Sequence, residues 1–488
     1  MKKIVLLLFA ASLCAPASDL VKHPRDLKYP ALTYQPPAAS SYRQKLSGGS
    51  TAYMVEDHAL PIINVTVLVR TGDYLEPANK VGLARLTGAQ MRSGGTKTRP
   101  PAEFDEQAAF LAAQIGSSIG DTEGEASVNC LTKDIDACLD LFFDMLHNPG
   151  FAEDRLKLAK VQAIQGLERR NDSTTSIEGR EFGRLLRGPD FFSVRPATKA
   201  SIDAITQADL IDFHSKYYFP ANFTFAVAGD FSTPEMIGKL NKAMAGWQNR
   251  SESIAAIPNP QFTPKPGLYV VDKKGVNQGR VSIGHIGTTF QNPDHLAINV
   301  MNAVLGGSGF TSRITTRVRS DEGLAYSAGS SFPAAAFYPS LFRTFFQSKS
   351  MSVPQAVAIS LEEIDRIRKE KVTPQELDVV KDYMINVLPQ RFATASLKAS
   401  QFAEDDFEHR PADYWQKYVE RVKAVAPDDV LRVAQKYLQP DKLVILVVGD
   451  AETILQGNPD KPQYQLTKFG TVTRLPLPDP LTMVYPNQ

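Results

Sequence analysis

The chain has 488 residues, with 54 lysines and arginines against 53 aspartates and glutamates, so its formal charge at pH 7 is only +1. This balance argues against nucleic acid or an anionic membrane surface as a partner. Hydrophobic residues make up 43% and charged residues 22%, which is typical of globular proteins and excludes disorder or a coiled coil as the main character. Because single cores stop growing near roughly 250–300 residues, we expect at least two domains.

The N-terminus has the pattern of a secretory signal peptide. Lys2 and Lys3 precede an apolar run at 4–13, and small residues up to Ala17 follow. We expect cleavage after Ala17 and a periplasmic or secreted protein. The run is well short of the ~20 residues that span a bilayer, so no membrane span is expected. Lipidation of Cys14 is the alternative interpretation, although Leu13 stands where a small residue would be expected.

Strands and helices alternate through the first half. Apolar, β-rich runs predict a strand that runs into a turn over 62–77 and a second strand at 126–133. A helix is expected at 101–116, where a proline stands in the first turn, and another at 134–150, which Asn-Pro-Gly closes. A third is expected at 153–172, which has separate charged and apolar faces.

Two cysteines, Cys130 and Cys138, remain after the predicted cleavage. A disulfide is possible in an oxidising compartment. The alternative, which we favour, is a pair of small buried residues on a strand and the following helix, because cysteine is among the most buried residue types.

A strand at 281–290 and a long helical stretch at 353–391 are expected in the second half. The two halves also share a repeated unit. Residues 208–230 and 428–450 match at a constant offset of 220, and each predicts an amphipathic helix, a proline that ends it, an apolar strand and a Gly-Asp turn. The chain therefore contains the same supersecondary unit twice.

We expect an α+β fold of two homologous domains, each a mostly antiparallel sheet with helices packed on one face. The proline-rich segment between the halves predicts an extended connector. The expected order is a signal peptide (1–17), an N-terminal extension (18–40), a first domain (41–250), a linker (251–266), a second domain (267–455) and a C-terminal tail (456–488).

Common catalytic motifs are missing from the sequence. None of the seven histidines stands three or four residues from another, so no helical turn carries a His-x-x-His or His-x-x-x-His metal pair. We expect His58 to be an exposed turn residue and His285 a packing residue in a strand. The glycine-rich GGSGF at 306–310 lacks the Lys-Ser/Thr of a phosphate-binding loop and is expected to be a flexible loop that ends a helix.

The two-copy organisation and TSRITTRVRSDEGLAYSAGSSF at 311–332 resemble the pitrilysin-type metallopeptidases, which include mitochondrial processing peptidase and insulin-degrading enzyme. The resemblance covers approximately residues 40–455. Active members carry an inverted zinc motif, H-x-x-E-H, on the first long helix, and a later glutamate is the third ligand. Both predicted domains are therefore expected to be peptidase-like.

The resemblance places four degenerate metal positions in this chain. The Gly-Leu-Ala lead of the zinc motif is kept at 82–84, but the motif positions fall on Arg85, Gly88 and Ala89, and the third ligand falls on Gln165. Glycine and alanine side chains cannot bind a metal, and an arginine would repel one. We expect no metal or other cofactor to be bound by this chain and no catalytic residue in the chain alone.

A second family feature is kept. The resemblance implies that Arg319 and Tyr326 match an Arg-x6-Tyr pair that reaches the substrate carbonyl beside the zinc site in active relatives. A guanidinium and a phenol O–H are donors suited to a peptide carbonyl and its developing oxyanion. The alternative is a surface arginine at a helix end and a half-buried strand tyrosine.

Bacterial members of this family often work as pairs in which one chain has the zinc motif and the other has the Arg/Tyr pair. The resemblance therefore implies a non-catalytic subunit of a heterodimeric peptidase, with zinc in a paralogous partner and a peptide or unfolded protein as substrate. The alternative is a structural or peptide-binding scaffold without a proteolytic role, comparable to the core proteins of the respiratory bc1 complex. A third possibility is an autonomous hydrolase that uses another site.

Overall fold

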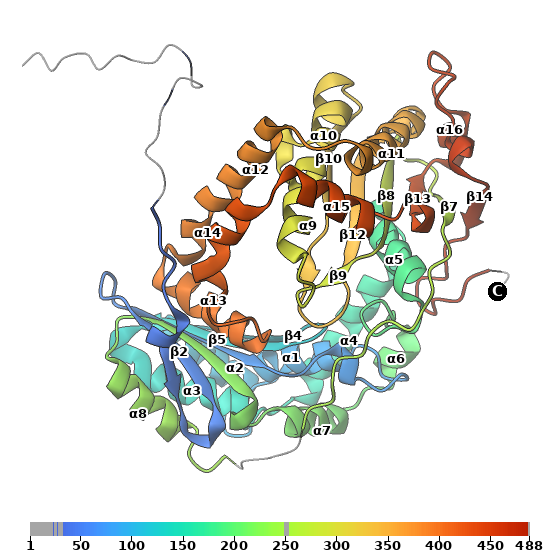
Figure 1. Cartoon of the computed structure of the whole chain (residues 1–488). Coiled ribbons are helices and arrows are strands. Elements are labelled where there is room, and N and C mark those ends of the chain that lie inside the picture. The colour runs from blue at the N-terminus through green and yellow to red at the C-terminus, as the bar shows by residue number, and fades with distance from the viewer. Residues whose placement is uncertain (1–22, 24–26, 28–32, 248–252, 487–488) are drawn as a thin grey trace, which may run out of the picture. The chain divides into compact units, whose positions relative to one another are not determined.

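Two six-stranded sheets, one in each half of the chain, form the centre of the structure, which is a computed structural model (Figure 1). The structure describes His23, Leu27 and residues 33–247 and 253–486. The predicted signal peptide at 1–17 and Cys14 lie outside the described residues. Residues from Pro36 onward form one compact unit.

The first sheet has the strand order β1-β2-β6-β3-β5-β4. Every neighbouring pair is antiparallel except β2 with β6. Its strands are β1 (Arg43–Lys45), β2 (Thr51–Glu56), β3 (Ile62–Val69), β4 (Gln114–Ile119), β5 (Gly124–Leu131) and β6 (Phe223–Gly229).

The second sheet has the order β10-β12-β8-β13-β7-β14, and only β7 pairs in parallel, with β13 and β14. The tail supplies β14, so its residues 472–475 belong to this sheet. The strands are β7 (Gly267–Asp272), β8 (Gln278–Ile286), β10 (Ala325–Ser331), β12 (Leu341–Lys349), β13 (Val444–Gly449) and β14 (Val472–Leu475), and a separate pair is formed by β9 (Thr288–Thr289) and β11 (Ala334–Ala335).

Helices follow the strands in both halves, as the α+β expectation requires. Those of the first half are α1 (Leu83–Ser93), α2 (Pro101–Phe110), α3 (Ile135–His147), α4 (Glu153–Glu168), α5 (Thr174–Arg187), α6 (Lys199–Asp203), α7 (Gln207–Tyr217) and α8 (Thr233–Ala243). Those of the second half are α9 (His295–Asn302), α10 (Arg313–Thr315), α11 (Val353–Lys369), α12 (Pro374–Asn386), α13 (Ala395–Phe407), α14 (Tyr414–Ala424), α15 (Pro427–Tyr437) and α16 (Ala451–Gln456). No helix of the described part is both long and apolar enough to cross a bilayer.

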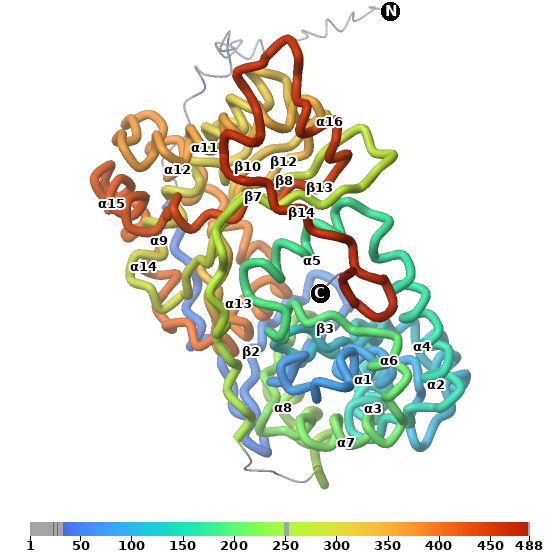
Figure 2. The backbone as a smooth tube through the Cα atoms, turned by 90° about the vertical axis from the view of Figure 1, so that its right-hand side faces the viewer, coloured from blue at the N-terminus to red at the C-terminus, as the bar shows by residue number. Residues whose placement is uncertain are grey.

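The two halves exchange one helix each. Helix α5 of the first half packs on β8 and β13 of the second sheet, and α13 of the second half packs on β2, β3 and β6 of the first (Figures 1 and 2). Alternate residues of β13 point to opposite faces, so Ile445 and Val447 join the second core while Leu446 and Val448 pack with Phe182 of α5. The mostly antiparallel sheets are confirmed, and the face opposite each main core is covered by a helix from the other half.

The repeated unit is confirmed. Helix α7, a 3₁₀ turn at Pro220–Asn222 and β6 recur as α15, a 3₁₀ turn at Pro440–Lys442 and β13. The exchanged helices α5 and α13 also lie about 220 residues apart, so the exchange follows the internal repeat.

Three predicted helices are too long, and the one expected at 153–172 ends at Glu168. The helix expected at 101–116 ends at Phe110, because Ala112 adopts a positive φ of 49° and the chain turns into β4. The stretch at 353–391 is broken after Lys369, and Thr373 begins α12 with a capping box that includes Glu376. Local breaks of this kind are set by one or two residues and are easily hidden by amphipathic periodicity.

Two histidine predictions are confirmed. The His58 side chain is 63% exposed, and its Nδ1 lies 2.7 Å from Asp230. The His285 ring is buried in β8, where Nδ1 donates to the Ile286 carbonyl and Nε2 accepts from the Gln439 N–H. Both rings have structural partners.

Cys130 on β5 and Cys138 on α3 are buried and present as free thiols. Burial raises the pKa of both thiols. This agrees with the interpretation of the pair as small buried residues.

Candidate functional site

Helix α1 carries three of the four degenerate metal positions, and Arg85 occupies the first. Its Nε donates to Asp73 Oδ2 over 3.0 Å, and its Nη2 lies 2.7 Å from Asp73 Oδ2 and 2.7 Å from Asp121 Oδ1. The guanidinium therefore bridges two carboxylates, one just before α1 and one in the turn between β4 and β5. A cation of the protein itself neutralises the acids at this position.

Gly88, at the second motif position, is required by close packing. The helix lies so near β4 that a Cβ at residue 88 would stand 2.4 Å from the Ile119 nitrogen and 2.7 Å from the Ser118 carbonyl carbon. The Ser117 hydroxyl also donates to the Gly88 carbonyl over 2.5 Å. The residue thus joins α1 to the edge strand β4 and leaves no room for the glutamate of an active family member.

The remaining degenerate positions, Ala89 on α1 and Gln165 on α4, are both exposed. These two helices contact each other. An arginine, a glycine, an alanine and a glutamine provide no imidazole or carboxylate, so this set of side chains does not fit a zinc ion. Within the described part of the chain, no three His, Cys, Asp or Glu side chains gather where they could hold a metal.

Two buried acids that the sequence analysis missed hold the start of α1. Glu76 accepts the N–H of Ala84 over 2.7 Å and the N–H of Gly82 over 3.1 Å. Burial, with the nearby charge of Asp73, raises the pKa of Glu76 to about 7, and burial raises the pKa of Asp73 to about 6. The available signal was the pair of acids in the turn before the helix, where carboxylates favour the exposed N–H groups.

Arg319 and Tyr326 are brought together, as the resemblance implies. Arg319 lies in the π-helical segment Thr316–Asp321, and its guanidinium carbon is 4.7 Å from the centroid of the Tyr326 ring. The two neighbouring arginines have carboxylate partners, since Arg313 pairs with Glu376 and Arg317 pairs with Glu362 and Glu363. Among the described residues, Arg319 pairs with no carboxylate.

Tyr326 is displayed by an irregularity in the edge strand β10. The register with β12 shifts between Ala325 and Ala328, so Tyr326 and Ser327 are both exposed instead of alternating. The Tyr326 side chain is 85% exposed. The alternative of a half-buried strand tyrosine therefore does not hold, and the phenol is exposed to other molecules.

Phe310 is a third member of this cluster that the sequence analysis missed. Its ring centroid lies 4.4 Å from the Arg319 guanidinium carbon, and the side chain is 66% exposed. It belongs to the GGSGF segment, which was expected only to end a helix. We call Phe310, Arg319 and Tyr326 the Arg/Tyr cluster. Its cation and two aromatic faces offer donors and flat apolar surface to a peptide.

Comparisons with known proteins identify the family. Residues 52–178 match the family "Insulinase (Peptidase family M16)", and residues 204–384 match "Peptidase M16 inactive domain". The chain belongs to the M16 peptidase family. Together the two matches span well over half of the chain, and the resemblance to pitrilysin-type enzymes is confirmed.

This M16 chain is similar both to a protein named a non-peptidase homologue and to one named a zinc protease. It is 22% identical over 411 residues to "Non-peptidase homolog YmxG" of Helicobacter pylori, covering 81% of this chain and 90% of that protein. It is 25% identical over 404 residues to "Zinc protease PqqE" of the same strain, covering 78% and 85%.

A solved structure from Pseudomonas fluorescens, described as a peptidase M16 inactive domain, has the same fold as this M16 chain. The TM-score is 0.75 at 23% identity, and the match covers 83% of this chain and 97% of that one. The expected fold of two α+β domains is thereby confirmed.

Proposed function

We propose that this chain is a non-catalytic M16 subunit that joins a zinc-bearing paralogue and supplies Arg319 and Tyr326 to a composite peptidase site. The observation that carries the proposal is the contrast between two places in one chain. At the degenerate metal positions, the Arg85 guanidinium forms ion pairs with Asp73 and Asp121. In the Arg/Tyr cluster, an arginine and an 85% exposed tyrosine remain available.

The relatives support a division of labour between two chains. One Helicobacter pylori strain has both a protein named a non-peptidase homologue and a protein named a zinc protease, and this chain is similar to both. A chain of the first kind needs a partner of the second kind to take part in proteolysis. In the proposed complex, zinc resides in the partner, and the substrate is a peptide or unfolded protein.

The proposed chemistry needs only donors from this chain. The Arg319 guanidinium and the Tyr326 O–H would bind the carbonyl oxygen of the scissile peptide and stabilise the negative charge that develops on it. The partner would bind the peptide main chain along an exposed sheet edge, which gives affinity with little sequence preference.

The predicted signal peptide supports a location of the complex in the periplasm or outside the cell. The mature chain purified from its native host should begin at residue 18, as measured by intact mass. A chain that retains residues 1–17 in full would contradict this location.

Co-expression with the zinc-bearing paralogue from the same genome tests the subunit role. The two chains should co-purify and cleave an unfolded peptide. Arg319→Ala should lower kcat by about 10²-fold or more, the loss typical of one oxyanion donor, while the zinc content of the complex stays unchanged.

Arg474→Ala, which changes an exposed arginine on β14, is the matched control and should leave turnover unaltered. Turnover that survives Arg319→Ala would favour the scaffold without a proteolytic role. Activity of the isolated chain that chelators do not remove would favour an autonomous hydrolase.

A further inference from the structure

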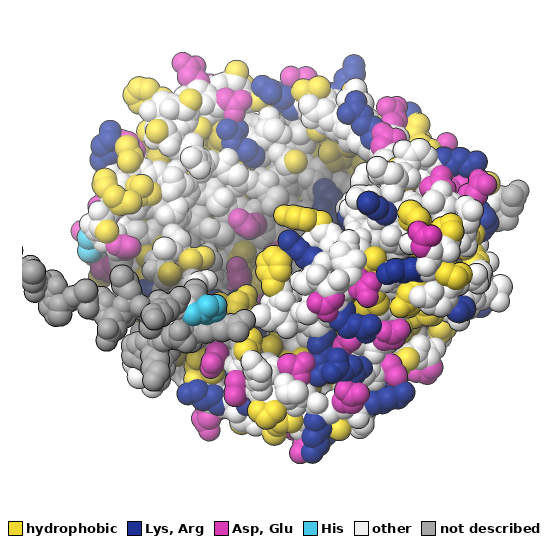
Figure 3. Space-filling model, turned by 90° about the horizontal axis from the view of Figure 1, so that it is seen from above, with side chains coloured by type: hydrophobic (Ala, Val, Ile, Leu, Met, Phe, Trp, Pro, Cys, Tyr) yellow, Lys and Arg dark blue, Asp and Glu magenta, His cyan; other side chains and the backbone are white. Residues whose placement is uncertain are grey.

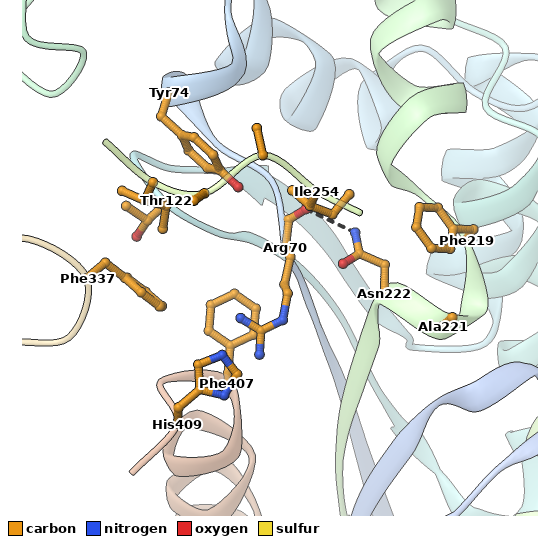
Figure 4. A pocket seen from close by; sticks show the side chains of 13 residues that line it. Arg70, Tyr74, Thr122, Phe219, Ala221, Asn222, Ile254, Phe337, Phe407 and His409 are labelled. Atoms are coloured by element: carbon orange, nitrogen blue, oxygen red, sulfur yellow. Dashed lines mark hydrogen bonds between the residues drawn. The ribbon is translucent and has the colours of Figure 1, made fainter. Parts of the chain in front are cut away.

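A pocket of about 540 Å³ opens where the end of β3, the connector and the end of α13 meet. Its volume lies in the range of small-ligand sites. Arg70 directly follows β3. Figure 4 shows its side chain pointing into the pocket, with Tyr74, Phe337 and Phe407 around it. The pocket contains neither the degenerate metal positions nor the Arg/Tyr cluster.

Arg70 is held over an aromatic ring without an acidic partner. Its guanidinium carbon lies 4.6 Å from the centroid of Phe407, a buried residue at the end of α13. Among the residues that the structure describes, its side chain forms no ion pair and no hydrogen bond. Burial lowers the pKa of Arg70, and the charge of Asp406 acts in the opposite direction from beyond ion-pair distance. Cation–π contact holds the group in place and leaves its N–H donors unused.

Asn222 holds the backbone of Arg70 in place, and the Tyr74 hydroxyl is a second hydrogen-bond donor in the pocket. The Asn222 amide donates to the backbone carbonyl of Arg70 over 3.0 Å and to that of Tyr217 over 2.6 Å. The Tyr74 ring packs edge-on against Phe192, with centroids 5.9 Å apart, and its hydroxyl has no protein partner in the described part of the chain. Burial raises the pKa of Tyr74 to about 12, so the phenol stays an O–H donor at neutral pH.

We propose that this pocket binds a single carboxylate carried on an apolar or aromatic body. The Arg70 guanidinium and the Tyr74 hydroxyl bind the carboxylate, and Phe337 and Phe407 contact the body. One cation with Asp406 nearby suits a group of charge −1 better than a phosphate. Either a small aromatic acid or the free C-terminal residue of a peptide has this chemistry.

Calorimetric titration of the full mature chain tests the proposal with matched pairs of acids and amides. The small pair is phenylacetate and phenylacetamide, and the peptide pair is acetyl-Ala-Ala-Phe with a free or an amidated C-terminus. At least one acid should bind about 10-fold or more tightly than its amide, because a charged hydrogen bond is lost in the amide. The acid that binds more tightly identifies the source of the carboxylate.

Three variants make the test specific. Arg70→Gln should remove the preference for the acid, and Tyr74→Phe should weaken acid binding several-fold while leaving amide binding unchanged, even if Arg70→Gln unfolds the chain. Arg391→Gln is the matched control, because Arg391 also lies over an aromatic ring, 5.2 Å from the centroid of Trp415, outside the pocket. Equal binding of acid and amide, no binding of either acid, or an equal loss in the Arg391→Gln control would overturn the proposal.

Discussion

Single residues determine the packing at the degenerate metal positions that the resemblance implies. Arg85 is tied to two carboxylates, and Gly88 is pressed against the β4 backbone. Restoring the zinc motif would therefore require more than three substitutions, because the backbone of β4 occupies the space that a larger side chain at residue 88 needs. The sequence predicts the missing ligands, but the contact between α1 and β4 is visible only in three dimensions.

Gly88→Ala should lower the free energy of unfolding by about 1–3 kcal/mol, the usual cost of overpacking a core. A Cβ at this position meets backbone atoms, which cannot rotate away. Gly166→Ala is the control, since a Cβ there meets nothing within 4 Å on α4. It should be neutral or stabilising by about 0.5–1 kcal/mol. Equal urea-unfolding midpoints for the two variants would contradict the packing role of Gly88.

Glu76 should make the protein less stable as the pH rises. Its pKa is raised from 4.5 to about 7 in the folded state, so the folded chain holds a proton that the unfolded chain has released between these values. The stability advantage of Glu76→Gln over wild type should therefore grow by about 3 kcal/mol between pH 4.5 and pH 7.5. Urea unfolding across this range measures the difference, and a difference independent of pH would contradict the raised pKa.

At the scale of elements, the exchange of α5 and α13 joins the two halves. Glu178 of α5 is buried, and its carboxylate pairs with Arg343 of β12 over 2.6 Å and accepts from the Ser282 hydroxyl of β8. In the opposite direction, Asn64 of β3 donates to Ser396 of α13 over 3.3 Å. Each sheet therefore depends on a helix that belongs to the other half.

Glu178→Gln should destabilise the chain by about 3 kcal/mol or more, because it leaves Arg343 without its buried carboxylate. The loss should be smaller in the Glu178→Gln, Arg343→Met double variant than the sum of the single losses. Thermal unfolding should remain a single transition, since both sheets lose a covering element together. Additive losses, or separate transitions for the two halves in wild type, would contradict the coupling.

The repeat at an offset of 220 and the class of each sheet followed from the sequence, because periodicity reports directly on which residues are buried. The exchange of α5 and α13 between the two halves could not be predicted from the sequence. Ile177, Phe182 and Leu186 predict an apolar face on α5, but the pattern cannot tell which sheet covers it. The family motif indicated Arg319 and Tyr326. Phe310 lies outside that pair of motif positions, and its contact with Arg319 depends on how the glycine-rich segment folds. The pocket around Arg70 combines distant segments and has no motif.

At the scale of the whole molecule, the tail completes the structure. Its strand β14 extends the second sheet, and Tyr485 donates to buried Glu181 of α5 over 3.0 Å. Near-neutral composition is reflected in the intermixed basic and acidic side chains of the surface seen from above (Figure 3). The two halves and the tail thus form a scaffold that presents the exposed Arg/Tyr cluster.

In the proposed complex, this chain contributes donors to a zinc site in another chain. The most direct measurement is the single-turnover rate constant for peptide cleavage by the complex with its zinc-bearing paralogue, in which Tyr326→Phe is compared with Tyr383→Phe. Tyr383 on α12 is also exposed, at 56%, and serves as the matched control. We expect a rate at least about 10-fold lower for Tyr326→Phe alone, with unchanged zinc content. Equal rates for the two variants would contradict it.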